Sequence, residues 1–354
     1  MDKELIDFFL NIFEHFIDPK KRIFLGYILI SLLIAFIWLI YVRKFSPTNA
    51  LRKIFDKRIF FSKSSRSDYS VFFLNRIFTL FISPMLITQI VIATLIYHFL
   101  HKLTWINLTI FHDIPKFTVV ILFTLTIFLL DDLTKYIVHR WMHKFPILWA
   151  LHKVHHSATE LTPLTIYRTH PLEGILFSLR SAFTQGTAIS TFFFLFGDKV
   201  TLATVLGVNV VIFVFNVAGA NLRHSHIGIR YWAWLEYILI SPAQHQLHHS
   251  VAKEHHDKNF GATLAIWDWI FKSLHQSTDT ETLVLGLDNN EKSKNHNLFT
   301  IYISPIIEIV KIIKVTSLNS HFKIINLVRN FFKIWQKSLR VLTKKDKDNK
   351  NVKI

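Results

Sequence analysis

Histidines are the residues of this sequence whose spacing could do chemistry. Eight of them occur in three blocks with HxxxH or HxxHH spacing: His139, His143, His152, His155, His156, His245, His248 and His249. Residues three or four apart on a helix lie on one face, so each block is predicted to present its imidazoles in one direction. Neutral imidazole binds Zn, Fe, Cu and Ni. The spacing therefore predicts a metal site built where the blocks meet.

The composition restricts what kind of metal site this can be. The chain contains no cysteine, which excludes disulfides and thiolate ligands. Zinc enzymes usually use three protein ligands and structural zinc sites four, so eight histidines suit two metals better than one. Carboxylate-bridged di-iron proteins use Glu and Glu-x-x-His, a pattern missing here. The site is therefore expected to consist almost wholly of histidine.

Hydropathy indicates a membrane protein. Of 354 residues, 51% are hydrophobic and 34 are phenylalanine, and the mean hydropathy is +0.33. This is too apolar for an ordinary soluble domain. The formal net charge of +17 is read as the cytoplasmic bias of Lys and Arg in membrane proteins rather than as nucleic-acid binding.

Apolar runs predict the elements that must position the histidines. About five membrane spans are expected, the last two forming a hairpin joined by Gly197-Asp198-Lys199: 23–42, 77–100, 117–130, 175–196 and 200–220. The third run is predicted to continue as one helix through Asp131 and Asp132 into the first histidine block. The predicted fold class is all-α, an integral membrane protein with a cytoplasmic helical cap that carries the histidines.

The number of spans provides a check on a shared site. Three spans precede His139, and the hairpin then returns the chain to the same side before His245. All blocks can therefore meet on the cytoplasmic side, where the cation-rich loop 43–70 is also expected.

Three regions are predicted along the chain. Residues 1–70 hold an amphipathic helix at 1–22, the first span and the basic loop. Residues 71–288 form the membrane domain with the histidines. Residues 289–354 are a linker and a basic amphipathic tail from 314, suited to an anionic membrane surface.

The blocks and their flanks carry a family resemblance. The flanks are Asp132-x-x-x-Tyr136-x-x-His139-Arg140, Arg168-x-His170-Pro171-x-Glu173, and Asp257-x-Asn259-Phe260-Gly261 followed by Trp267-Asp268. Over about 130–275 the sequence resembles the membrane fatty acid hydroxylase / sterol desaturase superfamily. The resemblance implies a non-haem centre of two iron ions that activates O2 to oxidise an unactivated C–H bond of a lipid.

The resemblance also assigns roles to residues. The eight block histidines carry over as metal ligands, and His224 matches an additional ligand position, with His226 as the alternative. Ligating imidazoles need partners for their other N–H, and Arg168, His170, Glu173 and Asp132 are candidates. Asp131 and Asp132 read equally well as a solvated helix end. His255 and His256 are expected at the surface, and Trp267 and Asp268 in packing and capping.

Two classes of function remain after this reading. The first is hydroxylation, rather than desaturation, of a membrane lipid such as a sterol, fatty acyl chain or ether lipid. Because no HPGG-type cytochrome b5 segment occurs, electrons are expected from a separate donor protein or a pterin. The alternative is a histidine-rich metal transporter or sensor. A transporter needs ionisable groups within its spans, and the fourth span has only Arg180 near its end, so the enzyme is favoured. No nucleic-acid partner is expected.

Overall fold

The computed structural model describes the chain except residues 1–12, 83–87, 104–110, 112, 201–209, 279–282, 288–295 and 317–354. The chain divides into two compact units, Met1–Pro305 and Ile306–Ile354. In the second unit the described residues, 306–316, are helical. The named elements of the described residues are all helices. Two isolated β-bridges also occur, Leu239 with Leu264 and Ser250 with Leu285. The all-α prediction is confirmed, whereas the three predicted regions stay a prediction.

Helix α7, Lys116–Lys144, is the element that links the apolar part of the first unit to the histidines. It is continuous over 29 residues, about 44 Å at 1.5 Å per residue. Val119 and Phe123 near its start pack with Phe192 and Phe196. The predicted continuation of the third apolar run into the first histidine block is confirmed. Within the described residues, α7 alone is long and apolar enough to cross a membrane, with a mean hydropathy of 1.9 over its most apolar window.

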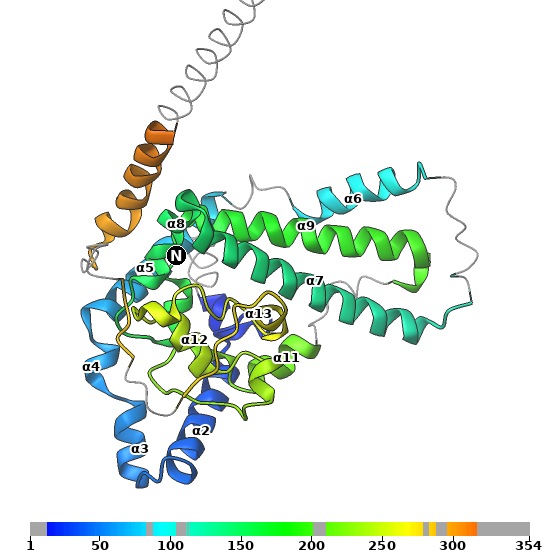
Figure 1. Cartoon of the computed structure of the whole chain (residues 1–354). Coiled ribbons are helices and arrows are strands. Elements are labelled where there is room, and N and C mark those ends of the chain that lie inside the picture. Colours follow the sequence, from blue (N-terminus) through cyan, green and yellow to red (C-terminus); the bar gives the residue numbers. More distant parts are fainter. Residues whose placement is uncertain are drawn as a thin grey trace, which may run out of the picture. The chain divides into compact units, whose positions relative to one another are not determined.

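Helix α9, Pro171–Phe196, packs along α7 on one side and along α6, Gln89–Leu100, on the other (Figure 1). Gly186 permits the second contact, since a Cβ there would lie 2.9 Å from the Gln89 carbonyl oxygen. Between α7 and α9, Arg180 Nη1 donates to Asp131 Oδ1 at 2.8 Å. Asp131 is 8% exposed and Asp132 2% exposed. The reading of these two aspartates as a solvated helix end is therefore wrong.

The second predicted span, 77–100, is not a single helix. Helix α5, Lys63–Ile82, ends within it, and α6 begins only at Gln89. Thr88 has an extended backbone, and its hydroxyl accepts from the Val91 N–H, which caps a new helix. Pro84, which could be tolerated in the span or kink it, lies outside the described residues. Alone, α6 rises about 18 Å, less than the hydrocarbon core of a bilayer.

The remaining predicted spans correspond to helices of different lengths. Helix α2, Leu25–Tyr41, occupies most of 23–42. The hairpin begins with α9, which ends where Gly197 adopts φ 56°, followed by η4, Gly197–Lys199. Of its second arm, the structure describes Val200 and α11, Val210–Val217. The predicted helices at 1–22 and in the tail lie mostly outside the described residues, which show helix at 13–17.

The basic segment 43–70 is helical rather than a loop. It contains α3, Pro47–Ile54, α4, Lys57–Phe60, and the start of α5. Helix α2 buries every fourth residue, Tyr27, Ser31, Ala35 and Leu39. This face packs against α3 and against η5, Ala220–His224. The first apolar helix thereby supports a segment that carries one of the predicted ligands.

Short elements complete the histidine region. Helix α12, Pro242–His248, begins with a capping box: Ser241 Oγ accepts from the Gln244 N–H at 3.1 Å, and Gln244 Oε1 accepts from the Ser241 N–H at 3.0 Å. The others are α8, Pro146–His156, η3, Pro163–Tyr167, η6, Leu235–Tyr237, η7, Lys253–His255, and α13, Ile266–Ile270.

A buried ion pair holds α8 in place. Arg168 is fully buried, and its guanidinium donates to Asp68 Oδ1 at 2.9 Å and to the Val154 carbonyl at 3.0 Å. It also donates to Ser157 Oγ at 2.8 Å. Thr165 Oγ1 donates to the second oxygen of Asp68 at 2.6 Å. Arg168 thus connects α5 to the end of α8, where two predicted ligands lie.

We expect Arg168→Met to destabilise the fold strongly, because Asp68 would be left buried without its cation. Breaking a buried ion pair in this way costs about 3–5 kcal/mol. The measurement is unfolding of the full chain in detergent. Arg58→Gln is the control, because its side chain is 90% exposed and pairs with Asp56 at the surface. Equal stability of the two variants would contradict the role given to Arg168.

Candidate metal centre

Nine histidine side chains form two adjacent groups. In each group, one nitrogen from every imidazole lies within 4.8 Å of one nitrogen from every other. The first group is His139, His143, His152, His156 and His248, and the second is His155, His224, His245 and His249. These are the nine side chains that the sequence analysis expects as ligands; that they bind metal stays a prediction.

Two helices and a tight reversal build the first group. His139 and His143 are one turn apart on α7. Phe145 is extended and Pro146 opens α8, which reverses the chain at once. His152 and His156, one turn apart on α8, are thereby placed opposite α7, with the rings of His143 and His156 4.7 Å apart. His248 of α12 closes the group, its ring 4.6 Å from that of His139.

Each HxxHH block is divided between the two groups. His152 and His156 face the first group, whereas His155 faces the second. In the other block, His248 faces the first group, whereas His245 and His249 face the second. The reason is that consecutive helical residues point about 100° apart, so two adjacent histidines cannot face one point. The expectation that each block faces one direction is therefore wrong for both HxxHH blocks.

Nitrogen positions within the groups fit metal ligation. His248 Nε2 lies 3.0 Å from His139 Nε2, and His245 Nε2 lies 3.0 Å from His224 Nε2. Two imidazole nitrogens at about 2.1 Å from one ion and roughly at right angles are about 3 Å apart. Nε2 of His143, His152 and His156 is buried without a hydrogen-bond partner, and so are both ring nitrogens of His249. Buried polar atoms normally have partners, and a cation supplies one.

The electrostatic environment keeps four of these imidazoles neutral. Burial lowers the pKa of His156, His224 and His249 well below 6.5, and neighbouring histidines lower it further. Burial lowers the pKa of His248 to about 3. A neutral imidazole retains the lone pair that a metal needs. At neutral pH these four imidazoles are therefore ready to accept cations rather than protons.

Three imidazoles of the first group are oriented by contacts with residues outside the group. His139 Nδ1 donates to the Phe260 carbonyl at 2.8 Å, and His248 Nδ1 donates to the Lys258 carbonyl at 2.7 Å. His152 Nδ1 lies 2.8 Å from Glu173 Oε1. Because a carbonyl can only accept, the proton of His139 and of His248 is on Nδ1. The lone pair of Nε2 then points to the interior of the group.

The two carbonyls come from a loop with unusual backbone. Asp257 and Asn259 have φ of 59° and 56°, which lets Lys258 and Phe260 both direct their carbonyls toward the histidines. Asp268 accepts from the N–H groups of Phe260 and Gly261 at 2.9 and 2.7 Å. A Cβ on Gly261 would lie 2.5 Å from the Leu264 oxygen, so only glycine fits. Sequence reasoning identified this flank but missed its role, because backbone carbonyls leave no trace in residue types.

The side chains of the other polar residues singled out from the sequence bind partners elsewhere. Arg168 binds Asp68, and His170 Nε2 donates to the Tyr302 carbonyl at 3.0 Å. Asp132 accepts from the N–H groups of Thr263 and Leu264 and from the Trp267 indole. Of the four candidates, only Glu173 has the expected contact; Asp132 instead attaches α7 to the segment after Gly261.

Histidines outside the two groups have separate environments. His226 Nε2 donates to the Lys53 carbonyl at 2.7 Å, away from both groups. His255 is 5% exposed and packs its ring 5.1 Å from His275, so its expected surface position is wrong. His256 is exposed as expected.

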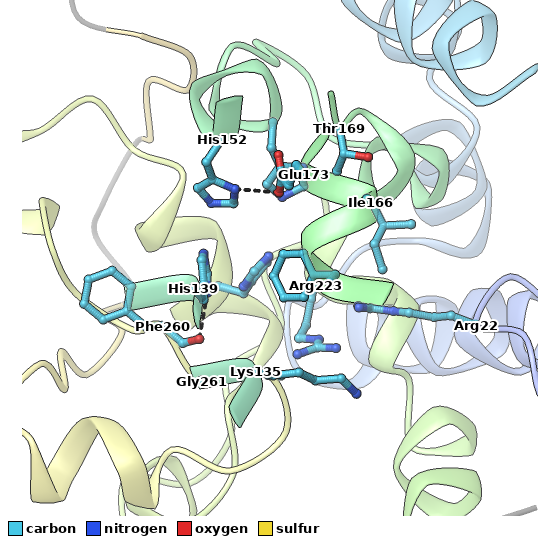
Figure 2. A pocket seen from close by; sticks show the side chains of 15 residues that line it. Arg22, Lys135, His139, His152, Ile166, Thr169, Glu173, Arg223, Phe260 and Gly261 are labelled. Carbon is cyan, nitrogen blue, oxygen red and sulfur yellow. Dashed lines mark hydrogen bonds and ion pairs between the residues drawn. The ribbon is translucent and has the colours of Figure 1, made fainter. Parts of the chain in front are cut away.

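A cavity of about 340 Å³ opens onto both groups (Figure 2). His139 and His152 reach it from the first group, and His155 and His245 from the second. Its wall also includes apolar Ile166, Phe177 and Phe260 and the cations Arg22, Arg223 and Lys135. A second cavity of about 390 Å³ touches His143, His156 and His248.

We predict that Glu173→Ala lowers metal affinity about 10–100-fold, because His152 loses the group that orients it. Glu173→Gln keeps an acceptor oxygen and should fall between Ala and wild type. The measurement is competition for Fe²⁺ between the full chain and a chelator under anaerobic conditions. Glu254→Ala, an exposed carboxylate, is the control. Unchanged affinity in Glu173→Ala would show that the contact does not support a ligand.

Comparison with known proteins finds similarity over the region that holds this arrangement. Residues 124–273 match the Fatty acid hydroxylase family. The chain is similar to alkylglycerol monooxygenase from Homo sapiens, 28% identical over 181 residues, 49% of this chain and 36% of the relative. It is also similar to ornithine lipid hydroxylase OlsE from Rhizobium tropici, 25% identical over 156 residues, 43% of this chain and 41% of the relative.

The matches cover the region that holds the histidines. The chain spans less than half the length of these curated relatives, and no solved structure matches it. The family match begins within α7 and extends past α13, so it includes all nine histidines and the loop that orients two of them. On this match and these relatives, the region that holds the histidines is similar to the fatty acid hydroxylase superfamily.

Proposed function

We propose that the chain is a membrane-bound oxidoreductase that uses O2 and two iron ions to hydroxylate a C–H bond of a lipid. The observation that carries this proposal is the pair of all-histidine groups that share one cavity. The first group would hold one ion and the second group the other. When bound, such ions supply the redox chemistry that activates O2, which amino-acid side chains lack.

The proximity of the two groups supports a joint centre rather than two separate sites. His155 and His156 are consecutive on α8, as are His248 and His249 at the end of α12. The rings of His156 and His249, one from each group, are stacked 4.6 Å apart. Two ions held by these groups would therefore be neighbours.

The chain's own residues would exclude water and guide an aliphatic substrate. Ile166, Phe177 and Phe260 give the cavity an apolar wall beside His139 and His155. Helix α7 leads from its apolar first half directly to this wall. A lipid could then approach from the apolar part of the first unit without passing through water.

The relatives favour hydroxylation over desaturation. Their printed names describe a monooxygenase of alkylglycerols and a hydroxylase of ornithine lipids. By this analogy the present chain would insert oxygen into a C–H bond of a lipid. Electrons would come from a separate donor protein or a pterin.

Histidines that are buried and fixed in orientation suit a metal that stays bound, as in an enzyme, better than one that a transporter or sensor must release. Three ligands of the first group are fixed by hydrogen bonds through Nδ1. Transport requires that the ion leave readily, and such fixed and buried ligands would retain it. The histidines are proposed to lie on the cytoplasmic face, below about five spans, with the basic tail on an anionic membrane surface.

Metal analysis tests the centre directly. The full chain, purified anaerobically without chelator, should hold about two iron atoms, one for each histidine group. His224→Ala should lose iron and lipid oxidation, because its Nε2 lies within 3.2 Å of His155 Nε2 in the second group. His226→Ala should retain both, because it lies outside. Retention of full iron and activity by His224→Ala would overturn the ligand assignment.

Cysteine labelling tests the proposed orientation, since the chain has no cysteine of its own. Lys102→Cys, in the expected outer connection, should react with an impermeant maleimide in intact cells. Glu254→Cys, near the histidines, should react only after the membrane is permeabilised. Both positions are exposed. Labelling of both from the same side would contradict the proposed topology.

A further inference from the structure

Two arginines on the wall of the histidine cavity have no carboxylate partner among the described residues. Arg22 precedes α2, and Arg223 lies in η5 beside His224, yet both line the cavity that His155 and His245 reach (Figure 2). Arg223 is 6% exposed. Among the described residues, neither guanidinium lies within 4.0 Å of a carboxylate oxygen.

The contacts of these arginines leave most of their donors unused. Arg22 Nη2 donates to the Ala220 carbonyl at 2.8 Å, and Arg223 Nε donates to the same carbonyl at 3.3 Å. Arg22 Nε is buried without a partner. Arg223 stacks its guanidinium 5.1 Å from the centre of the Phe215 ring. One carbonyl thus holds two cations side by side.

The other charges of the cavity wall are already matched. Lys135 pairs with Asp131 at 2.6 Å. Glu173, the carboxylate of the wall, accepts from His152. Neither arginine has such a partner, and taking a guanidinium out of water is unfavourable unless an anion balances it.

Guanidinium groups recognise a particular class of anion. Their planar forks match the oxygen pairs of carboxylates and phosphates, and such bonds are about twice as strong as neutral ones. We propose that Arg22 and Arg223 bind the oxyanion group, phosphate or carboxylate, of the lipid that this cavity admits. The inference rests on the proposed function and narrows its substrate class to lipids with an anionic head.

The position of the arginines also restricts where the lipid is oxidised. The cavity volume of about 340 Å³ is at the lower end of the range of about 300–1,000 Å³ for ligand sites. A head group bound by the arginines and the ligating imidazoles would share this one volume. The oxidised carbon would then be close to the head group, while the rest of the lipid extends out of the cavity.

Calorimetric binding to the purified full chain in non-ionic detergent tests the proposal. The probes are dihexanoyl phosphatidic acid, dihexanoylglycerol and inorganic phosphate, without reductant, so that no turnover occurs. The anionic lipid should bind at least about tenfold more tightly than the neutral one, because it gains charge-assisted hydrogen bonds. Free phosphate should bind more weakly than the anionic lipid, since it lacks the apolar contacts.

Substitutions assign the effect to the two arginines. Arg22→Gln and Arg223→Gln should each weaken binding of the anionic lipid about tenfold and leave the neutral lipid unaffected. Arg22→Lys and Arg223→Lys keep the charge but lose the fork, and should be intermediate; they also serve if a Gln variant fails to fold. Arg52→Gln is the matched control, because Arg52 is exposed and outside the cavity.

The outcomes separate the two proposals. Equal binding of anionic and neutral lipids, or wild-type binding by both the Gln and the Lys variants, would overturn the anion site. Free phosphate binding as tightly as the lipid would overturn the assignment to a lipid. Anion-selective binding without any lipid oxidation would leave the anion site standing and refute the oxygenase. Oxidation of lipids regardless of head-group charge would leave the oxygenase standing and refute the anion site.

Discussion

The arrangement of the histidines depends on the angle of about 100° between consecutive residues of an α-helix. A helix can direct residues i and i+4 to one point, because they lie about 40° apart around its axis, whereas residue i+3 lies about 100° from i+4. In each HxxHH block, this angle sends one pair to one group and the single histidine to the other. Helices α8 and α12 each contribute to both groups. The block on α8 gives its pair to the first group, whereas the block at α12 gives its pair to the second. Two neighbouring groups follow from one sequence pattern used twice.

Orientation of the rings requires a second kind of contact that helices cannot supply. The loop 257–261 is held by Asp268 and by Asn259, whose side chain donates to the Gln244 carbonyl at 3.1 Å. Gln244 itself belongs to the capping box that begins α12. The same helix therefore carries ligands and anchors the loop that orients one of them, His248. Rigidity of the centre comes from this closed set of backbone contacts.

Sequence reasoning succeeded where a single helix determines the outcome. The continuity of α7 through Asp131 and Asp132 was predicted from an apolar run that is short by itself, and the proximity of the nine histidines followed from three blocks and a resemblance. It failed where the position or partner of a residue depends on a distant segment of the chain. Thr88 begins a new helix inside an apolar run, Asp132 binds the N–H groups of Thr263 and Leu264, and His255 is buried against His275. Residue types alone do not reveal such partners, because each depends on where another segment of the chain passes.

The reversal at Phe145 and Pro146 has a consequence for how this protein reaches its folded state. It brings α7 and α8 together locally, whereas α12 must arrive from about a hundred residues further along the chain, and closing a loop of that length carries an entropic cost that grows with its logarithm. An ion in the first group would join α12 to both helices and so offset that cost, as structural metals do in small domains. In the proposed centre, iron supply would then limit the yield of folded protein as well as its turnover. A cell short of iron would carry less of this chain, not merely an idle form of it.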